Sequence, residues 1–289
     1  MDERQVRRSR AAIAAALPQP TARRLEREAA GKRRTRRQTA ISAVSTVAVL
    51  GALITLIVTS QGWPTVKDTF FNVSDFKESF PAVAKGFWLD VKLFCIIEVG
   101  VLILGLLIAL ARISRAPALF PLRLLSSVTV DVLRGVPVIL VIYLIGFGVP
   151  ALELTGVPDD PLVLGAIALG LTYSAYVGEV YRAGIASVHP GQRHAALAVG
   201  LSESQAMRRV ILPQAIRRVA PPLLNDFVSL QKDVSLISIL GPLEAFRVAQ
   251  IEASSNFVYT PLVAAALLYL CVTVPLARIL DHWERGRRR

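Results

Sequence analysis

The sequence predicts an all-α polytopic membrane protein with about six transmembrane helices. Hydrophobic residues make up 53% of its 289 residues and charged residues only 19%, below the roughly one quarter typical of soluble domains. The hydrophobic residues gather in runs of the length that spans a bilayer core, about 20 residues of helix. The net charge of +12 is distributed between these runs rather than over one domain face, which argues against nucleic-acid binding.

Six apolar runs are candidate spanning helices, at approximately 40–60, 87–111, 126–149, 162–181, 222–240 and 259–280. The first and the last show the clearest pattern, and the first contains no charged residue. The fifth is the most polar, because it contains Asp226, Lys232 and Asp233. Pro137 lies inside the third run and is a candidate kink.

The basic residues predict the orientation of the chain, since cytoplasmic loops carry an excess of Lys and Arg. With six crossings, 26 of the 33 Lys and Arg residues fall on one side, in the segments 1–37, 112–123, 182–226 and 278–289. The intervening loops are balanced or acidic. This pattern predicts a multi-pass protein of the plasma or inner membrane with cytoplasmic N- and C-termini.

We expect five regions along the chain. They are a basic cytoplasmic tail at 1–38, an extra N-terminal transmembrane helix at 39–61, an external loop at 62–86, a transmembrane domain at 87–281 and a basic tail at 282–289. Two interpretations of the first tail stay open. It is either an orientation signal that contacts anionic headgroups, or a helix from Thr21 to Gln38 that docks on a partner.

The long cytoplasmic loop between the fourth and fifth runs has its own predicted structure. Residues 189–213, which we call the knob, begin with a turn signal and an Ala-rich, helix-favouring stretch. Gly200 permits a sharp break, and Ser202 with Gln205 has capping-box spacing for a second helix, which Pro213 ends or kinks. The apolar residues of the knob either contact a partner protein or pack against the chain's own helices, and both alternatives stay open.

The knob resembles the EAA motif of ABC-importer permeases. In that family Glu-Ala-Ala is followed after three residues by Gly and after nine more by Ile-x-Leu-Pro, and this chain has His194-Ala195-Ala196, Gly200 and Ile211-Leu212-Pro213. Other blocks resemble the branch that imports polar amino acids: Leu133-Arg134-Gly135-Val136-Pro137, Glu179-Val180-Tyr181-Arg182-Ala183-Gly184, Gly191-Gln192, Val210-Ile211-Leu212-Pro213-Gln214-Ala215, Asn225 and Lys232-Asp233-Val234-Ser235-Leu236. The departures are His194, where Glu is usual, and Val136 and Val234, where Thr is usual.

The resemblance implies the transmembrane domain of a type I ABC importer. Such a permease pairs with a second permease subunit, similar or identical, and works with a cytoplasmic ABC ATPase dimer and an external solute-binding protein. The expected coupling residues are His194, Ala195, Ala196, Gly200, Leu201 and Ser202. The chain lacks a Gly-x-x-x-x-Gly-Lys-[Ser/Thr] phosphate loop, so we expect no cofactor on it and expect the partner ATPase to use ATP and magnesium.

Charged residues inside spanning segments are costly and are candidates for function. The candidate substrate pathway comprises Glu98, Arg134, Glu179, Lys232 and Asp233. Arg134 and Lys232 could meet the extra carboxylate of glutamate or of a related acidic or amide amino acid, whereas the acidic residues leave basic amino acids open. A spacing of three also allows two structural ion pairs, Asp131–Arg134 and Glu179–Arg182.

Two other classes of function stay open from the residues alone. An ion-coupled secondary transporter or channel would act without an ATPase and is typically built from an inverted repeat, which the two halves of this chain do not show. A membrane scaffold would use the knob to recruit proteins but would leave the intramembrane charges unexplained. Neither a catalytic motif nor a metal-ligand spacing appears in the sequence.

Overall fold

The computed structural model describes residues 22–114 and 116–287, and this part of the chain contains helices and no strands. The chain divides into two units, 1–65 and 66–289. The elements are α2 (Ala22–Val58), α3 (Trp63–Phe70), α4 (Val73–Ile113), η1 (Pro117–Leu119), α5 (Phe120–Gly135), α6 (Val138–Ala151), α7 (Pro161–Ala186), α8 (Pro190–Ala198), α9 (Glu203–Ala206), η2 (Met207–Ile211), α10 (Leu212–Asp233), η3 (Val234–Leu240), α11 (Ala245–Asn256) and α12 (Thr260–Arg287).

In the first unit, α2 has the properties of a lipid-surrounded helix. Its apolar part, Thr35–Val58, is 24 residues long with a mean hydropathy of 2.4, enough to cross a bilayer. Its large hydrophobic side chains are between 46% and 70% exposed, and the hydroxyls of Thr39 and Thr46 donate to backbone carbonyls one turn earlier. The helix expected from Thr21 to Gln38 is present from Ala22 onward as the first part of α2. Its role, as an orientation signal or as a docking helix, stays open, and residues 1–21 lie outside the described residues.

The segment 62–86, which we expected to be a loop, is largely helical. It contains α3 and the first part of α4, a single helix of 41 residues. Asn72 caps α4 by accepting hydrogen bonds from the backbone N–H groups of Ser74 and Asp75, and Asp75 complements the positive end of the helix dipole. This cap starts the helix well before the apolar run, so hydropathy alone placed the boundary too late.

The third apolar run, 126–149, is not one continuous span. It is divided between α5 and α6, whose axes are bent by 111°. Pro137 has no N–H to continue α5, and the residue before a proline avoids the helical region. Val136 accordingly adopts an extended backbone with φ −104° and ψ 136°. The proline therefore produces a break where we expected a kink within one helix.

The knob continues directly into the membrane domain, which differs from the expectation that its second helix ends or kinks at Pro213. After α9 the helix widens into the π-helical turn η2 and then runs on as α10. Pro213 lies in the first turn of α10, directly after this π-helical turn, and does not end the helix. The helical path from Glu203 to Leu240 then bends by 53° into α11.

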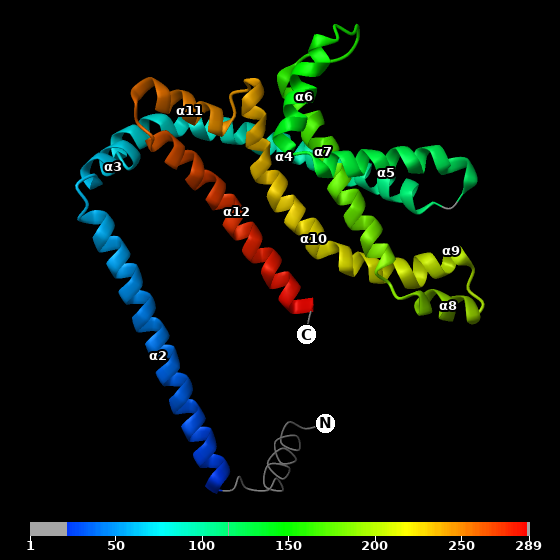
Figure 1. Cartoon of the computed structure of the whole chain (residues 1–289), viewed down its shortest axis with the longest axis horizontal. Helices are drawn as coiled ribbons and strands as arrows, with labels where there is room; N and C mark the ends of the chain where they lie inside the picture. Colours follow the sequence, from blue (N-terminus) through cyan, green and yellow to red (C-terminus); the bar gives the residue numbers. More distant parts are fainter. Residues whose placement is uncertain (1–21, 115, 288–289) are drawn as a thin grey trace, which may run out of the picture. The chain divides into compact units, whose positions relative to one another are not determined.

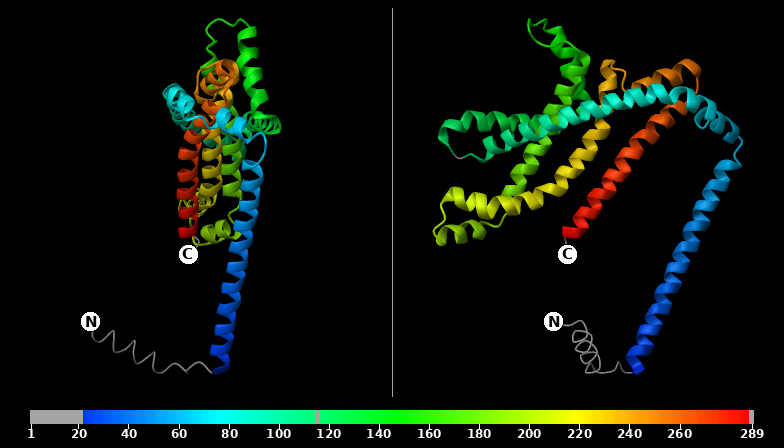
Figure 2. Two further views of the ribbon diagram at one scale, coloured as in Figure 1. Left: turned by 90° about the vertical axis from the view of Figure 1, so that its left-hand side faces the viewer. Right: turned by 180° about the vertical axis from the view of Figure 1, so that it is seen from behind.

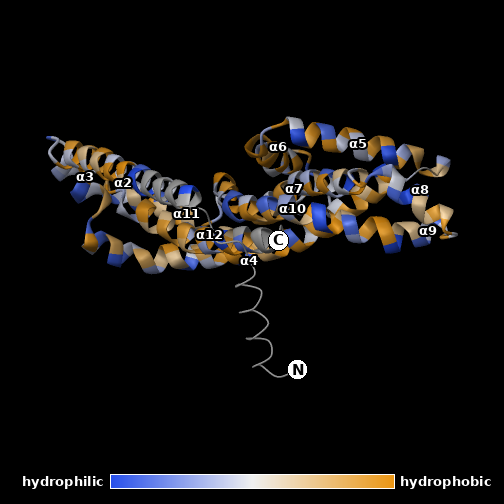
Figure 3. Cartoon of the chain, turned by 90° about the horizontal axis from the view of Figure 1, so that it is seen from below, coloured by the Kyte–Doolittle hydropathy of each residue, from blue (hydrophilic) through white to orange (hydrophobic). Residues whose placement is uncertain are grey.

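The predicted six crossings match the upper count in the structure. Four helical segments are long and apolar enough to span a membrane alone, and the number rises to six if each of the two bent pairs forms one span. In the second unit, α4 crosses α7, α10 and α12, whose axes are roughly parallel, with α10 running in the opposite direction to α7 and α12 (Figures 1 and 2). Figure 3 shows hydrophobic residues along most of α6, as expected for a helix in contact with lipid.

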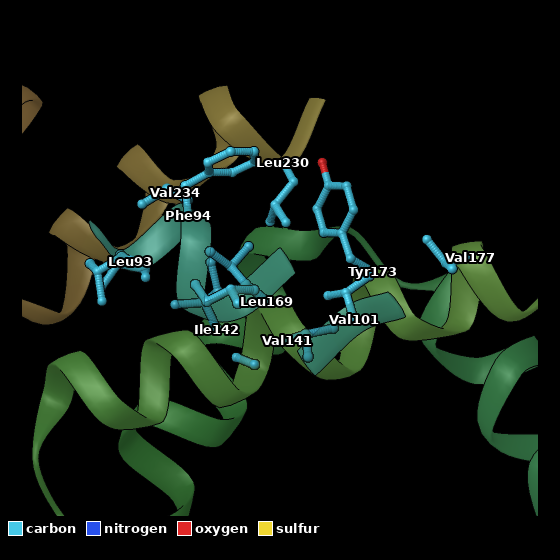
Figure 4. Packing of buried hydrophobic residues seen from close by; sticks show 13 residues of the cluster. Leu93, Phe94, Val101, Val141, Ile142, Leu169, Tyr173, Val177, Leu230 and Val234 are labelled. Carbon is cyan, nitrogen blue, oxygen red and sulfur yellow. The ribbon is translucent and has the colours of Figure 1, made fainter. Parts of the chain in front are cut away.

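Two apolar clusters hold the second unit together. The larger one joins α4, α6, α7 and the end of α10 with η3, and its centre includes Val101, Ile142, Leu169 and Leu230, all fully buried (Figure 4). The smaller cluster joins α4 to α11 and α12 around Val83 and Ala249. Lipid tails are as apolar as these side chains, so close van der Waals packing rather than removal from water holds such clusters together within a bilayer. Helix α4 contributes residues to both clusters and connects them.

Candidate functional site

The break at Gly200 ends α8 in a defined way. Gly200 has φ +86°, a left-handed conformation that favours glycine. Its N–H donates to the Leu197 carbonyl at 3.0 Å, and the Leu201 N–H donates to the Ala196 carbonyl at 3.1 Å. These two bonds form a Schellman motif, which satisfies the last carbonyls of a helix. The predicted helix–glycine–helix arrangement is present.

The second helix of the knob begins with the predicted capping box. The Ser202 hydroxyl accepts from the Gln205 N–H at 3.3 Å, and the Gln205 side chain accepts from the Ser202 N–H at 2.9 Å. Arg193 on α8 also donates two hydrogen bonds to Glu203 on α9, at 2.9 and 2.7 Å. The ion pair and the two caps hold the short helices at a fixed angle, so the knob can move as one body.

The predicted coupling residues divide between the surface and the interior of the knob. His194, Ala195, Gly200 and Ser202 are exposed, whereas Leu201 is half-buried and Ala196 is only 5% exposed. Ala196 therefore packs inside the knob. Val199, which sequence reasoning missed, is 78% exposed. The sequence signal that could have indicated this exposed side chain is its place directly before Gly200, the glycine that ends α8.

A second feature is a cavity of about 500 Å³ between α5, α7 and α10, lined by Arg134, Tyr176, Glu179, Val180, Ala183, Gly184, Ser187, Arg218, Pro222 and Asp226. Arg134 lies 5.7 Å from the centre of the Tyr176 ring and close enough to Asp226 for their charges to attract. Arg218 donates to the backbone carbonyl of Ser187. The cavity is therefore bordered by groups of both charges.

The predicted pathway residues are only partly brought together. Arg134 and Glu179 line the cavity, and Glu98 lies outside its lining but within charge–charge range of Asp226. Lys232 is exposed, and Asp233 accepts a hydrogen bond from the Tyr173 hydroxyl at 2.7 Å. Lys232 and Asp233 thus lie outside the cavity. Asp226 and Arg218 were not predicted as pathway residues, although both lie on α10 together with Lys232.

Glu179 is also held in an ion-pair cluster that joins α4 to α7. It accepts from Arg112 at 2.6 Å and from Arg182 at 2.6 and 2.9 Å. The predicted pair Glu179–Arg182 is confirmed, whereas Arg112 was not foreseen as a partner. The predicted pair Asp131–Arg134 does not form in the described part of the chain, because the Arg134 guanidinium lies against the Tyr176 ring instead.

Comparison with known proteins fits this geometry. Residues 101–289 match the family described as the binding-protein-dependent transport system inner membrane component. The chain belongs to this family. The permease is 34% identical over 215 residues to a probable glutamine ABC transporter permease of Bacillus subtilis, covering 74% of the permease and 97% of that relative.

Other relatives carry different names. An arginine transport permease of Bacillus subtilis is 30% identical, covering 71% of the permease and 92% of the relative. An L-cystine transport permease of the same organism is 34% identical, with coverages of 78% and 92%. A crystal structure of an amino acid ABC transporter with histidines is 32% identical with a TM-score of 0.65, covering 71% of the permease and 94% of that chain.

A more distant solved structure supports the fold alone. The inward-facing methionine transporter MetNI is 18% identical with a TM-score of 0.51, covering 71% of the permease and 95% of that chain. These matches confirm the helical transmembrane fold that the resemblance implied. The family match begins at residue 101, so α2, α3 and most of α4 lie outside it.

Proposed function

We propose that the permease imports polar amino acids and draws the energy from a separate cytoplasmic ABC ATPase dimer that uses ATP and magnesium. In this proposal a second permease subunit, similar or identical, completes the membrane pathway, and an external solute-binding protein delivers the substrate. The observation that carries the proposal is the knob: a rigid body with an exposed face that continues without interruption into α10, a wall of the charged cavity. Both termini and the knob face the cytoplasm in this arrangement.

Docking of the ATPase on the knob can be tested at Val199. This side chain is 78% exposed, so Val199→Asp leaves the interior of the knob intact while it introduces a charge on the proposed contact face. We expect ATPase recovered by co-purification from membranes to fall about tenfold or more, since desolvating an unpaired charge in an interface costs several kcal/mol.

Val157→Asp is the matched control, because Val157 is also exposed but lies in the connection between α6 and α7. We expect this variant to recover the ATPase normally. Unchanged recovery with Val199→Asp would place the docking site elsewhere. Substrate transport by vesicles that contain the permease without any ATPase would instead favour an ion-coupled transporter.

Within the polar amino acids, we propose glutamate or a related acidic or amide amino acid as the substrate. Glu179 is already neutralised by two arginines, so the remaining charged groups of the cavity lining are Arg134, Arg218 and Asp226. An α-ammonium group suits Asp226, and two carboxylates suit two guanidinium groups, which bind carboxylates in a bidentate manner. This charge balance supports an acidic amino acid over a basic one.

Arg134→Gln tests the substrate in the assembled transporter. We expect labelled glutamate uptake to fall by about tenfold or more, because a charge-assisted hydrogen bond contributes about 1.5–3 kcal/mol, and we expect glutamine uptake to fall less. Lys85→Gln removes an exposed positive charge outside the cavity and is expected to leave both rates unchanged. A wild-type preference for arginine, or unchanged glutamate uptake in Arg134→Gln, would contradict the assignment.

A further inference from the structure

A separate cavity of about 290 Å³ gathers three arginines from three helices. It is lined by Arg112 at the end of α4, by Arg123 with Phe120, Leu124 and Ser127 on α5, and by Arg182 near the end of α7. The lining of this cavity shares no residue with the lining of the proposed substrate cavity. It contains three guanidinium groups and no carboxylate of its own.

The guanidinium groups are only partly satisfied by the protein. Arg112 and Arg182 share one carboxylate, that of Glu179, so the three arginines and this neighbour carry an excess of two positive charges. Arg123 donates one hydrogen bond to the Ser114 carbonyl at 3.2 Å and lies 5.2 Å from the centre of the Phe120 ring. Each guanidinium has five N–H donors, which leaves several donors for a multivalent oxygen acceptor.

The α5 side of the cavity is apolar and exposed on the single chain. Leu124 and Phe120 both line it, yet they are 54% and 53% exposed. Along the same helix Leu125 and Val128 are 64% and 52% exposed, so the flank of α5 beside the cavity is apolar. A ligand with a phosphate at the arginines and a hydrocarbon chain along α5 would match both surfaces.

We propose that this cavity binds the phosphate group of an anionic phospholipid, with the acyl chain lying along α5. Arginine binds phosphate oxygens in a bidentate manner, and basic pockets between transmembrane helices bind anionic headgroups. Free inorganic phosphate offers the same oxygens but lacks the chain that the exposed side chains of α5 would contact. Because Arg112 on α4 also pairs with Glu179 on α7, the bound lipid would brace this junction.

The test uses the full chain extracted from vesicles made of equal parts phosphatidylglycerol and phosphatidylcholine, with the retained lipid measured by native mass spectrometry. We expect the wild type to retain phosphatidylglycerol in preference to phosphatidylcholine. Arg123→Gln should lower this preference by about fivefold, the effect of one basic residue near a lipid headgroup. Arg278→Gln, which removes an exposed arginine on α12 outside the cavity, should not lower it.

Ser127→Leu provides a second variant, because it fills the cavity and leaves all three arginines in place. It should lower the preference in the same way as Arg123→Gln. Equal retention of both lipids by the wild type, or an unchanged preference in both variants, would overturn the proposal. A preference that inorganic phosphate abolishes, together with stabilisation of the wild type by phosphate alone, would identify the ligand as the free ion and would also overturn it.

Discussion

Replacing Gly86 by valine is expected to separate α4 from the start of α11 and to destabilise the permease severely. A Cβ atom at Gly86 would lie 2.7 Å from the backbone carbon of Glu244 and 2.8 Å from the backbone nitrogen of Ala245. These are backbone atoms, so a rotamer change cannot relieve the clash. Overpacking of this kind costs about 3 kcal/mol, and sometimes more.

The loss of stability should exceed the cost of the clash itself, because hydrogen bonds of Asp90 also depend on the contact between α4 and α11. Asp90, one turn after Gly86, accepts from the Tyr269 hydroxyl at 2.7 Å and from the Ala245 N–H at 3.3 Å. Separating the helices would break these bonds and expose the smaller apolar cluster. We expect the melting temperature in detergent to fall by about 5–10 °C.

Gly100→Val is the matched control on the same helix. A Cβ atom there would meet nothing within 4 Å, and valine in a helix is slightly more favourable than glycine. We expect Gly100→Val to melt within about a degree or two of the wild type. Equal melting temperatures for the two variants would show that α4 and α11 do not approach each other this closely.

Glu179→Gln is expected to give the second large loss of stability. The change leaves Arg112 and Arg182 without their shared carboxylate, and the side chains of Arg112 and Glu179 are only 14% and 19% exposed. Removing one partner of a largely buried pair costs about 3 kcal/mol. Thermal unfolding of the purified chain measures this cost, and uptake assays are not needed for it.

The knob supplies the comparison for this experiment. Glu203 accepts two hydrogen bonds from Arg193 with similar geometry, but its side chain is 61% exposed. Glu203→Gln should therefore cost less than about 1 kcal/mol. If Glu179→Gln unfolds like the wild type yet transports poorly, the residue acts in the pathway rather than as a helix connector.

Local signals in the sequence predicted the knob well. The glycine break and the capping box depend on residues within a few positions of one another, so their spacing is sufficient to predict them. The exposure of individual residues was harder to predict: the Ala196 side chain is buried, whereas Val199 is 78% exposed. That outcome depends on how the two short helices pack, which spacing does not encode.

Long-range contacts explain the remaining differences. Arg112 and Glu179 are 67 positions apart, and their pairing follows from the crossing of α4 and α7. The cavity likewise combines α5, α7 and α10. Hydropathy alone could not show that Asp226 and Arg218 line it while Lys232 and Asp233, on the same helix, do not. The break at Pro137 was visible in the sequence, but its 111° angle depends on the packing of α6.

The uninterrupted path from Glu203 to Leu240 has a mechanical consequence. Because the path is helical throughout, a push on the short helices is expected to be passed along it to Asp226, at a distance set by about 1.5 Å per residue. The natural pivot is the wide turn Met207–Ile211, since π-helical turns are often found at functional sites. Twisting at that turn would convert a push on the knob into a movement of the Asp226 carboxylate at the cavity wall.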